Sequence, residues 1–158
     1  MFPEVLYEDN HTIVVLKPAG VLVQPSISKD STANNLDLAR MVKGYLKEKY
    51  KKPGNVFLGI VHRLDRPVSG IVLFAKTSKG AARLSEQFRN RSIKKTYSAV
   101  IEGEIFPGDG YLTHSLVKDQ KTKKSFVDQS GDTAELQYKT IKSNGKFSLL
   151  EIEIRTGR

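Results

Sequence analysis

The first half of the chain combines short apolar runs with a stretch whose apolar residues recur at helical spacing. Residues 5–8 (VLYE) and 12–17 (TIVVLK) predict two short strands. Farther along, apolar side chains mark one face of a helix, at Leu38, Met41, Val42, Tyr45 and Leu46. We expect this amphipathic helix to begin after Asp30 or Ser31, either of which can accept first-turn N–H groups, and to end before Pro53.

The next segments alternate between buried strands and a second helix. Residues 56–61 (VFLGIV) and 70–75 (GIVLFA) are apolar runs rich in branched side chains, which predict buried strands. Ser78 is then expected to cap a helix whose inner face includes Leu84 and Phe88. The remainder predicts five strands, at residues 94–101, 111–117, 124–128, 133–142 and 146–155.

This order of elements indicates the fold class. It lacks the regular alternation of strand and helix that a doubly wound parallel sheet requires, and it contains no internal repeat or linker. We therefore expect residues 1–158 to form a single α+β domain with a mixed, largely antiparallel sheet flanked by helices. A chain of this length is long enough to bury one core.

Charge and composition restrict the function. The chain carries 26 Lys and Arg against 17 Asp and Glu, a net charge of +9, which favours a polyanion such as nucleic acid. It has no cysteine and only three dispersed histidines, so we expect no metal site. No apolar run approaches the roughly 20 residues that span a bilayer, and the start, MFPEVLYEDN, lacks signal-peptide features. We expect a cytoplasmic protein that binds no membrane.

Residues 61–70, VHRLDRPVSG, place one acid, Asp65, between Arg63 and Arg66 on the connection between two predicted core strands. One interpretation is a surface ion pair, which stabilises little because solvent screens it. The other is a reactive acid, since nearby cations favour the ionised form that a nucleophile requires. Gly70 permits backbone conformations that other residues resist, so we expect a shaped connection. The pattern alone leaves both interpretations open.

Four ordered motifs cover nearly the whole chain. They are the KPAG turn within residues 7–26, HRLDRPVSG at 62–70, IKKTYSAVIEG at 93–103 and RTGR at 155–158. Together they resemble the RluA-type pseudouridine synthases, whose corresponding motifs are KPxG, HRLDxxTSG, K-x-Y-x-A-x-V-x-G and the start of TGRxHQxR. The hallmark motif departs from the family pattern at Val68, where threonine is usual.

The resemblance implies an isomerase that converts uridine in rRNA or tRNA to pseudouridine without a cofactor. It implies that Asp65 is the catalytic nucleophile, that Tyr97 packs against the target base, and that Arg63 helps to flip the uridine out. Asp65 can attack C1′, add to C6 or remove the C2′ proton, and the sequence does not choose among these routes.

The contacts with RNA are expected from basic residues near this site. We expect them at Arg66, Lys94, Lys95 and Arg158. The alternative for any single basic residue is a solvated surface role. Tyr97 also has an alternative, because it shares a strand face with Ala99 and Ile101 and is suited to core packing.

The chain ends within the TGRxHQxR motif, so we expect a catalytic domain that is incomplete at its C-terminal end. Because the family's core begins almost at the first residue, we expect no separate N-terminal RNA-binding domain. The exposed sheet edge would favour self-association. Two alternatives are a catalytically silent RNA-binding fragment and an Asp-dependent hydrolase of a glycosidic bond. The second is weakened because no paired carboxylate is evident.

Overall fold

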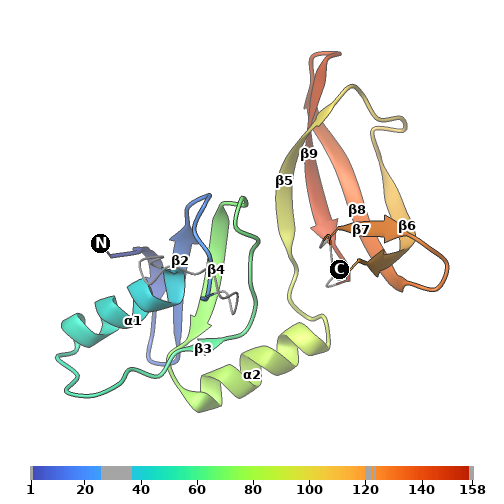
Figure 1. Ribbon diagram of the computed structural model, residues 1–158. Coiled ribbons are helices and arrows are strands. Elements are labelled where there is room, and N and C mark those ends of the chain that lie inside the picture. The colour runs from blue at the N-terminus through green and yellow to red at the C-terminus, as the bar shows by residue number, and fades with distance from the viewer. Residues whose placement is uncertain (1, 26–36, 120–121, 123, 157–158) are drawn as a thin grey trace. The chain divides into compact units, whose positions relative to one another are not determined.

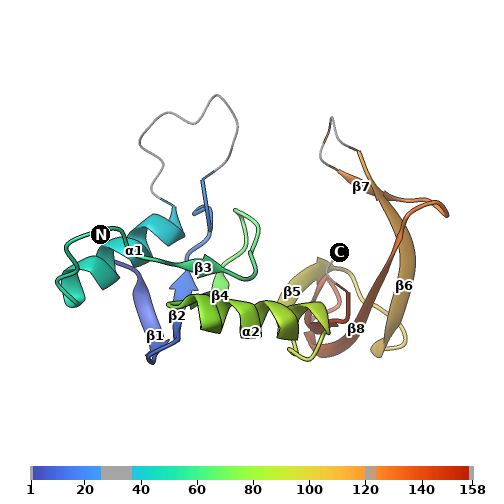
Figure 2. The ribbon, with the colours of Figure 1, turned by 90° about the horizontal axis from the view of Figure 1, so that it is seen from below.

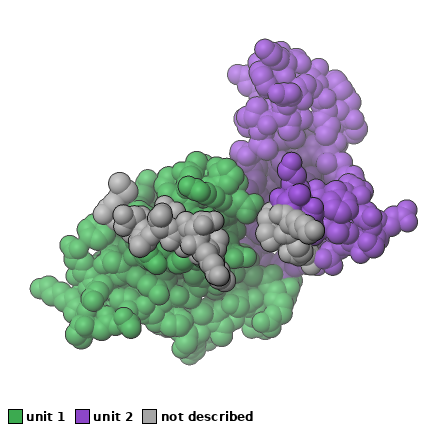
Figure 3. All heavy atoms as spheres, in the orientation of Figure 1, with its two compact units in different colours: residues 1–90 green, residues 91–158 purple. Residues whose placement is uncertain are grey.

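A computed structural model describes residues 2–25, 37–119, 122 and 124–156. The chain divides into two compact units, residues 1–90 and 91–158 (Figure 3). The first contains two helices and a four-stranded sheet, and the second a five-stranded sheet (Figure 1). The predicted α+β class is confirmed. The expectation of one mixed sheet is wrong, because the described strands form two sheets in which every pairing is antiparallel.

The first unit is built on the strand order β1-β2-β4-β3. The bounds of these strands are β1 Glu4–Glu8, β2 Thr12–Lys17, β3 Gly59–Ile60 and β4 Gly70–Ala75. Alternate positions of the two central strands point to one face, so Ile13 lies opposite Phe74 and Val15 opposite Val72. All four side chains are fully buried, and this face of the sheet therefore forms the core.

The strand expected at residues 56–61 is reduced to Gly59–Ile60. Its neighbour β4 continues, but the chain leaves the sheet after Ile60. The N–H of Leu73 is instead accepted by the side chain of His62, at 2.9 Å from Nε2. A side chain thus replaces the backbone acceptor that a longer strand would have supplied, and this frees the following residues to form a connection.

Helix α1, Leu38–Lys49, covers the buried face of this sheet with Leu38, Val42 and Leu46. Its N-cap is Asp37, whose carboxylate accepts the N–H of Arg40 at 3.0 Å. The expected start after Asp30 or Ser31 is therefore corrected to Leu38, and these two residues lie outside the described ones. Asp37 directly precedes Leu38, the first buried residue of the helix, and its side chain can therefore accept a free N–H group of the first turn.

Helix α2, Ser78–Arg89, begins one residue earlier than expected, because Thr77 and not Ser78 is its N-cap. Thr77 has extended backbone angles and its hydroxyl accepts the N–H of Gly80 at 3.1 Å. The helix approaches β3 closely: a Cβ added at Gly59 would lie 2.8 Å from the Cβ of Ala81. Residue 59 is therefore a glycine for steric reasons. No helix of the described residues is long and apolar enough to cross a membrane.

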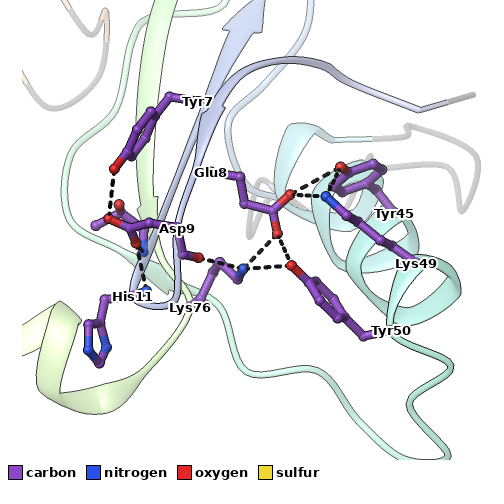
Figure 4. Close-up of polar contacts among 9 residues, drawn as sticks. Tyr7, Glu8, Asp9, His11, Tyr45, Lys49, Tyr50 and Lys76 are labelled. Atoms are coloured by element: carbon purple, nitrogen blue, oxygen red, sulfur yellow. Dashed lines mark hydrogen bonds and ion pairs between the residues drawn. The ribbon is translucent and has the colours of Figure 1, made fainter.

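A carboxylate ties β1 to α1 and to the end of β4 (Figure 4). Glu8 is 9% exposed and accepts from Lys49 at 2.7 Å, Lys76 at 2.6 Å, Tyr50 at 2.7 Å and Tyr45 at 3.1 Å. Burial by itself raises the pKa of Glu8, but these four donors outweigh it and lower the pKa from 4.5 to about 2. The folded state therefore favours the ionised carboxylate.

We expect Glu8→Gln to lower the free energy of unfolding by about 3 to 4 kcal/mol at pH 7, since the pKa falls from 4.5 to about 2 and each unit of pKa shift corresponds to about 1.4 kcal/mol. Because the pKa is depressed, the contribution is complete above pH 4.5 and is lost as the pH falls toward about 2. Urea unfolding of both proteins over this range measures it. Glu4→Gln, on an exposed position of the same strand, is the control. A constant difference between pH 7 and pH 3 would contradict the assignment.

The second unit is a sheet of order β5-β9-β8-β6-β7. Its strands are β5 Thr96–Glu102, β6 Asp109–Lys118, β7 Ser125–Val127, β8 Asp132–Ser143 and β9 Phe147–Ile154. All five were expected within two residues of these bounds, because alternating patterns identify strands well. One face carries Tyr138 and Leu150, which are buried, and Tyr97, which is half-buried opposite Ile152.

Candidate active site

The connection between β3 and β4, residues 61–69, presents the predicted acid on a firmly anchored backbone. His62 and Leu64 are half-buried, whereas Arg63 and Asp65 are exposed, so successive side chains point alternately inward and outward. Leu64 packs against the core of the first unit. Gly70 ends the connection with φ +146°, a conformation that favours glycine, as the sequence predicted. Asp65 therefore faces solvent from a shaped connection.

His62 holds the start of this connection. Its Nε2 accepts the N–H of Leu73, so the ring proton belongs on Nδ1, and the ring stacks on Phe88 of α2 with centroids 4.8 Å apart. The sequence predicted a hydrogen-bonded structural histidine here in preference to a general base, and the hydrogen bond is confirmed. The contact also joins the connection to the second helix.

A second segment, the turn at residues 17–20, is tied to the connection at Arg66. Lys17 is fully buried, and its ammonium donates to three carbonyl oxygens: Pro18 at 3.1 Å, Val21 at 2.7 Å and Arg66 at 3.2 Å. The Arg66 carbonyl also accepts the N–H of Gly20 at 2.7 Å, while Arg66 Nε donates to the Gly20 carbonyl at 2.9 Å. We call these contacts the Lys17–Arg66 tie.

Lys17 also acts on Asp65 through its charge. Burial lowers the pKa of Lys17, and the negative charge of Asp65 opposes that shift. All three ammonium protons are directed to carbonyl oxygens, so the attraction between the two residues acts through space. The first unit thus places a buried cation near enough to the exposed acid for the two charges to attract.

Sequence reasoning assigned Lys17 no chemistry, although a signal was present. Lys17 continues the inward alternation of Ile13 and Val15, and the register places it opposite Gly70, where the connection ends. A lysine at an inward strand position needs buried acceptors. The carbonyl oxygens that satisfy it come partly from a segment 49 residues away, and a local pattern does not reveal them.

The arginines around Asp65 are used differently from each other. No ion pair within the described ranges joins Asp65 to Arg63 or Arg66, so the interpretation of this stretch as a surface ion pair is wrong. Arg66 is held against the turn through its carbonyl and Nε. Arg63 is exposed beside the acid and has no such contact in the part of the chain that is described, which leaves its guanidinium available for a ligand.

The other predicted site residues belong to the second unit. Tyr97 lies in β5, half-buried on the same face as Ala99, which agrees with both interpretations of this tyrosine. Lys94 forms an ion pair with Glu153 at 2.9 Å, and the carbonyl of Lys95 accepts the N–H of Ile154. Arg158 lies outside the described residues. In the part of the chain that is described, no three His, Asp or Glu side chains gather as metal ligands would.

A family model for RNA pseudouridylate synthases matches residues 11–158 of this chain. The chain belongs to this family. The ribosomal large subunit pseudouridine synthase D of Zymomonas mobilis is 35% identical over 98% of the chain and 49% of its own length. The tRNA pseudouridine synthase C of Pectobacterium carotovorum is 30% identical over 98% of the chain and 42% of its own length.

The fold is shared with solved structures of synthase domains. The structure of human RNA pseudouridylate synthase domain containing 4 superposes with a TM-score of 0.80 at 22% identity, over 98% of this chain and 60% of that one. The curated relatives are longer than this sequence, which spans about half of their length. The RluA-type resemblance of the motifs therefore agrees with the family and with the fold.

Proposed function

We propose that this chain carries the catalytic region of an RNA pseudouridine synthase that isomerises uridines in rRNA or tRNA, with Asp65 as the nucleophile. The observation that carries the proposal is the position of Asp65. It is exposed on a connection anchored by Leu64 and Gly70, near a buried lysine, in a motif that resembles the family's HRLDxxTSG. The two classes of RNA are suggested by the names of the relatives.

The reaction breaks the bond between C1′ and N1 of uridine, rotates the uracil and forms a bond from C1′ to C5. The proton on C5 leaves to solvent and N1 gains a proton, so that no atom or electron enters from a cofactor. An ionised Asp65 suits each of its three routes, namely attack on C1′, addition to C6 or removal of the C2′ proton.

The target nucleotide has to leave its stack before Asp65 reaches it, which costs a few kcal/mol. Arg63 is exposed beside the acid and forms no ion pair with any other described residue, so its guanidinium can stack in the vacated space and bind phosphate. Tyr97 is proposed to lie against the extruded uracil, where stacking contributes about 1 to 3 kcal/mol. Further phosphate contacts are proposed for Arg66, Lys94, Lys95 and Arg158. Among these, Lys94 first has to leave Glu153.

Release of tritium from RNA labelled at C5 of uridine tests the proposal, with the full natural chain as the enzyme. We expect tritium release together with pseudouridine in the digested product. RNA binding without tritium release would instead support a catalytically silent RNA-binding protein. Free uracil in place of pseudouridine would indicate a hydrolase of the glycosidic bond. Either result would overturn the proposed function.

A further inference from the structure

The exposed side of α1 carries a row of lysines. Lys43 and Lys47 are four residues apart in α1 and share one side of the helix, Lys51 follows just after the helix ends, and all three are exposed. We call them the α1 lysine stripe. Like charges at this spacing repel and destabilise a helix. Lys43 and Lys47 therefore repel one another on the exposed side of α1.

The stripe also lacks neutralising partners within its own unit. The ion pairs among the described residues of the first unit are Arg40 with Asp37, and Lys49 and Lys76 with Glu8. No ion pair in the described ranges involves the stripe, although Glu48 is within one helical turn. The positive charge of the stripe is therefore left to solvent.

The backbone at the end of α1 gives a second, independent observation. The N–H of Lys52 donates to the Lys47 carbonyl at 3.0 Å and that of Lys51 to the Glu48 carbonyl at 3.2 Å, a pattern that requires left-handed backbone at residue 51. Glycine is the usual residue there, yet Lys51 occupies it with φ +47°. Lys51 is therefore strained at a position where a glycine would be more stable.

A basic residue also takes the left-handed conformation at the end of the other helix. Among the described residues other than glycine, only Lys51 and Arg91 have a positive φ, and Arg91 directly follows the C-cap of α2. Residues that adopt this conformation are usually Asn or Asp. A cation near a helix C-terminus is favourable, but Lys47 and Lys49 in the last turn already supply that interaction. The helix dipole therefore does not account for the lysine at residue 51.

We propose that the α1 lysine stripe binds the phosphate backbone of the substrate RNA outside the uridine site. The inference rests on the proposed function, which supplies a polyanion as the ligand. Figures 1 and 2 both show the C-terminal end of α1 at the opposite end of the first unit from residues 61–69. A phosphate contact there requires an RNA that extends well beyond the target nucleotide. The substrate is thus an extended RNA, and a short oligonucleotide leaves the stripe unused.

An anionic membrane is the other polyanion that a lysine-rich helix can meet. A helix that lies in a membrane surface needs an apolar face for the lipid. The apolar face of α1 is occupied, because Leu38, Val42 and Leu46 are buried in the core of the unit. The structure therefore favours RNA, which needs only exposed charge.

The test compares two triple variants with equal loss of charge. Lys43→Gln/Lys47→Gln/Lys51→Gln removes the stripe, and Lys139→Gln/Lys142→Gln/Lys146→Gln removes three exposed lysines of the second unit. Binding of a labelled rRNA transcript is measured over a series of KCl concentrations. The stripe variant is expected to lower the slope of log K against log salt by about 2, since each phosphate contact contributes about 0.7. The control is expected to change the slope by less than 1.

Two further measurements separate the stripe from general charge and from misfolding. The stripe variant is expected to bind and convert a short oligonucleotide as the natural protein does. Lys51→Gly is expected to raise the Tm by about 2 °C because it relieves the left-handed strain, while it weakens binding of the transcript. Equal slopes for the two triple variants, or a Tm lowered by Lys51→Gly, would overturn the inference.

The outcomes also separate this inference from the proposed function. A changed slope with no tritium release would leave the stripe as an RNA contact while the enzymatic proposal fails. Tritium release with an unchanged slope would support the enzymatic proposal and overturn the stripe as an RNA contact. A third outcome would overturn RNA as the partner. In it, the natural protein binds vesicles of phosphatidylserine and phosphatidylcholine, the stripe variant does not, and both proteins bind the transcript equally.

Discussion

Asp65→Asn is expected to abolish pseudouridine formation while the protein stays folded. Asparagine has nearly the same shape but is neutral and a poor nucleophile, so each of the three routes open to Asp65 fails. Loss of a nucleophile typically costs a factor of about 10⁴ or more in rate. Tritium release under single-turnover conditions measures this loss. RNA affinity is expected to change little, because the exposed carboxylate forms no ion pair within the described ranges.

Two controls make this experiment decisive. Asp65→Ala excludes recovery of the carboxylate by deamidation of the asparagine. Asp109→Asn changes an exposed aspartate at the start of β6 and is expected to leave the rate unchanged. Urea unfolding of all three variants checks that they fold. If Asp65→Asn and Asp65→Ala kept more than about one hundredth of the natural rate, the nucleophile would have to be another residue.

Lys17→Met is expected to have the second-largest effect, on stability and on turnover together. Methionine fills similar space but removes the donor for the carbonyl oxygens of Pro18, Val21 and Arg66. Buried acceptors without a partner cost about 1 to 3 kcal/mol each, although the Arg66 carbonyl keeps the N–H of Gly20. We expect the free energy of unfolding to fall by about 2 to 4 kcal/mol.

The effect of Lys17→Met on turnover distinguishes positioning of Asp65 from a purely structural role. The rate constant of the folded variant is expected to fall by about 100-fold with little change in KM, because Asp65 loses both its fixed backbone and a nearby positive charge. Lys142→Met, at an exposed position, is the control. A folded variant with the natural rate constant would show that the Lys17–Arg66 tie serves stability alone.

The sequence predicted the elements well and their pairing poorly. Alternation and helical spacing depend on neighbouring residues. Nine of the eleven described helices and strands, all except α1 and β3, were therefore recognisable from local pattern with nearly correct bounds. The division into two sheets depends on which strand edges meet, which is decided by contacts far apart in the chain. The cap of α2 was displaced by one residue because Thr77 and Ser78 both have hydroxyls, and only the backbone angles separate them.

The candidate site shows the same limit. The connection with Asp65, the conformational need for Gly70 and the structural role of His62 were recognisable locally. Two contacts were not recognisable locally. Lys17 donates to the carbonyl of Arg66, 49 residues away, and Lys94 pairs with Glu153, 59 residues away. Neither partner is visible in a local pattern. Long-range polar contacts therefore account for what sequence reasoning missed.

The Lys17–Arg66 tie has a consequence for how this site can diverge between species. Most of its contacts use main-chain atoms, namely the carbonyl of Arg66 and both the N–H and the carbonyl of Gly20. Almost any residue can provide a carbonyl, so a substitution at position 66 removes the contact from Arg66 Nε but keeps the main-chain contacts that hold Asp65 in place. Lys17 has no such freedom. Natural selection can thus fit position 66 to a new RNA while the position of the acid is inherited unchanged.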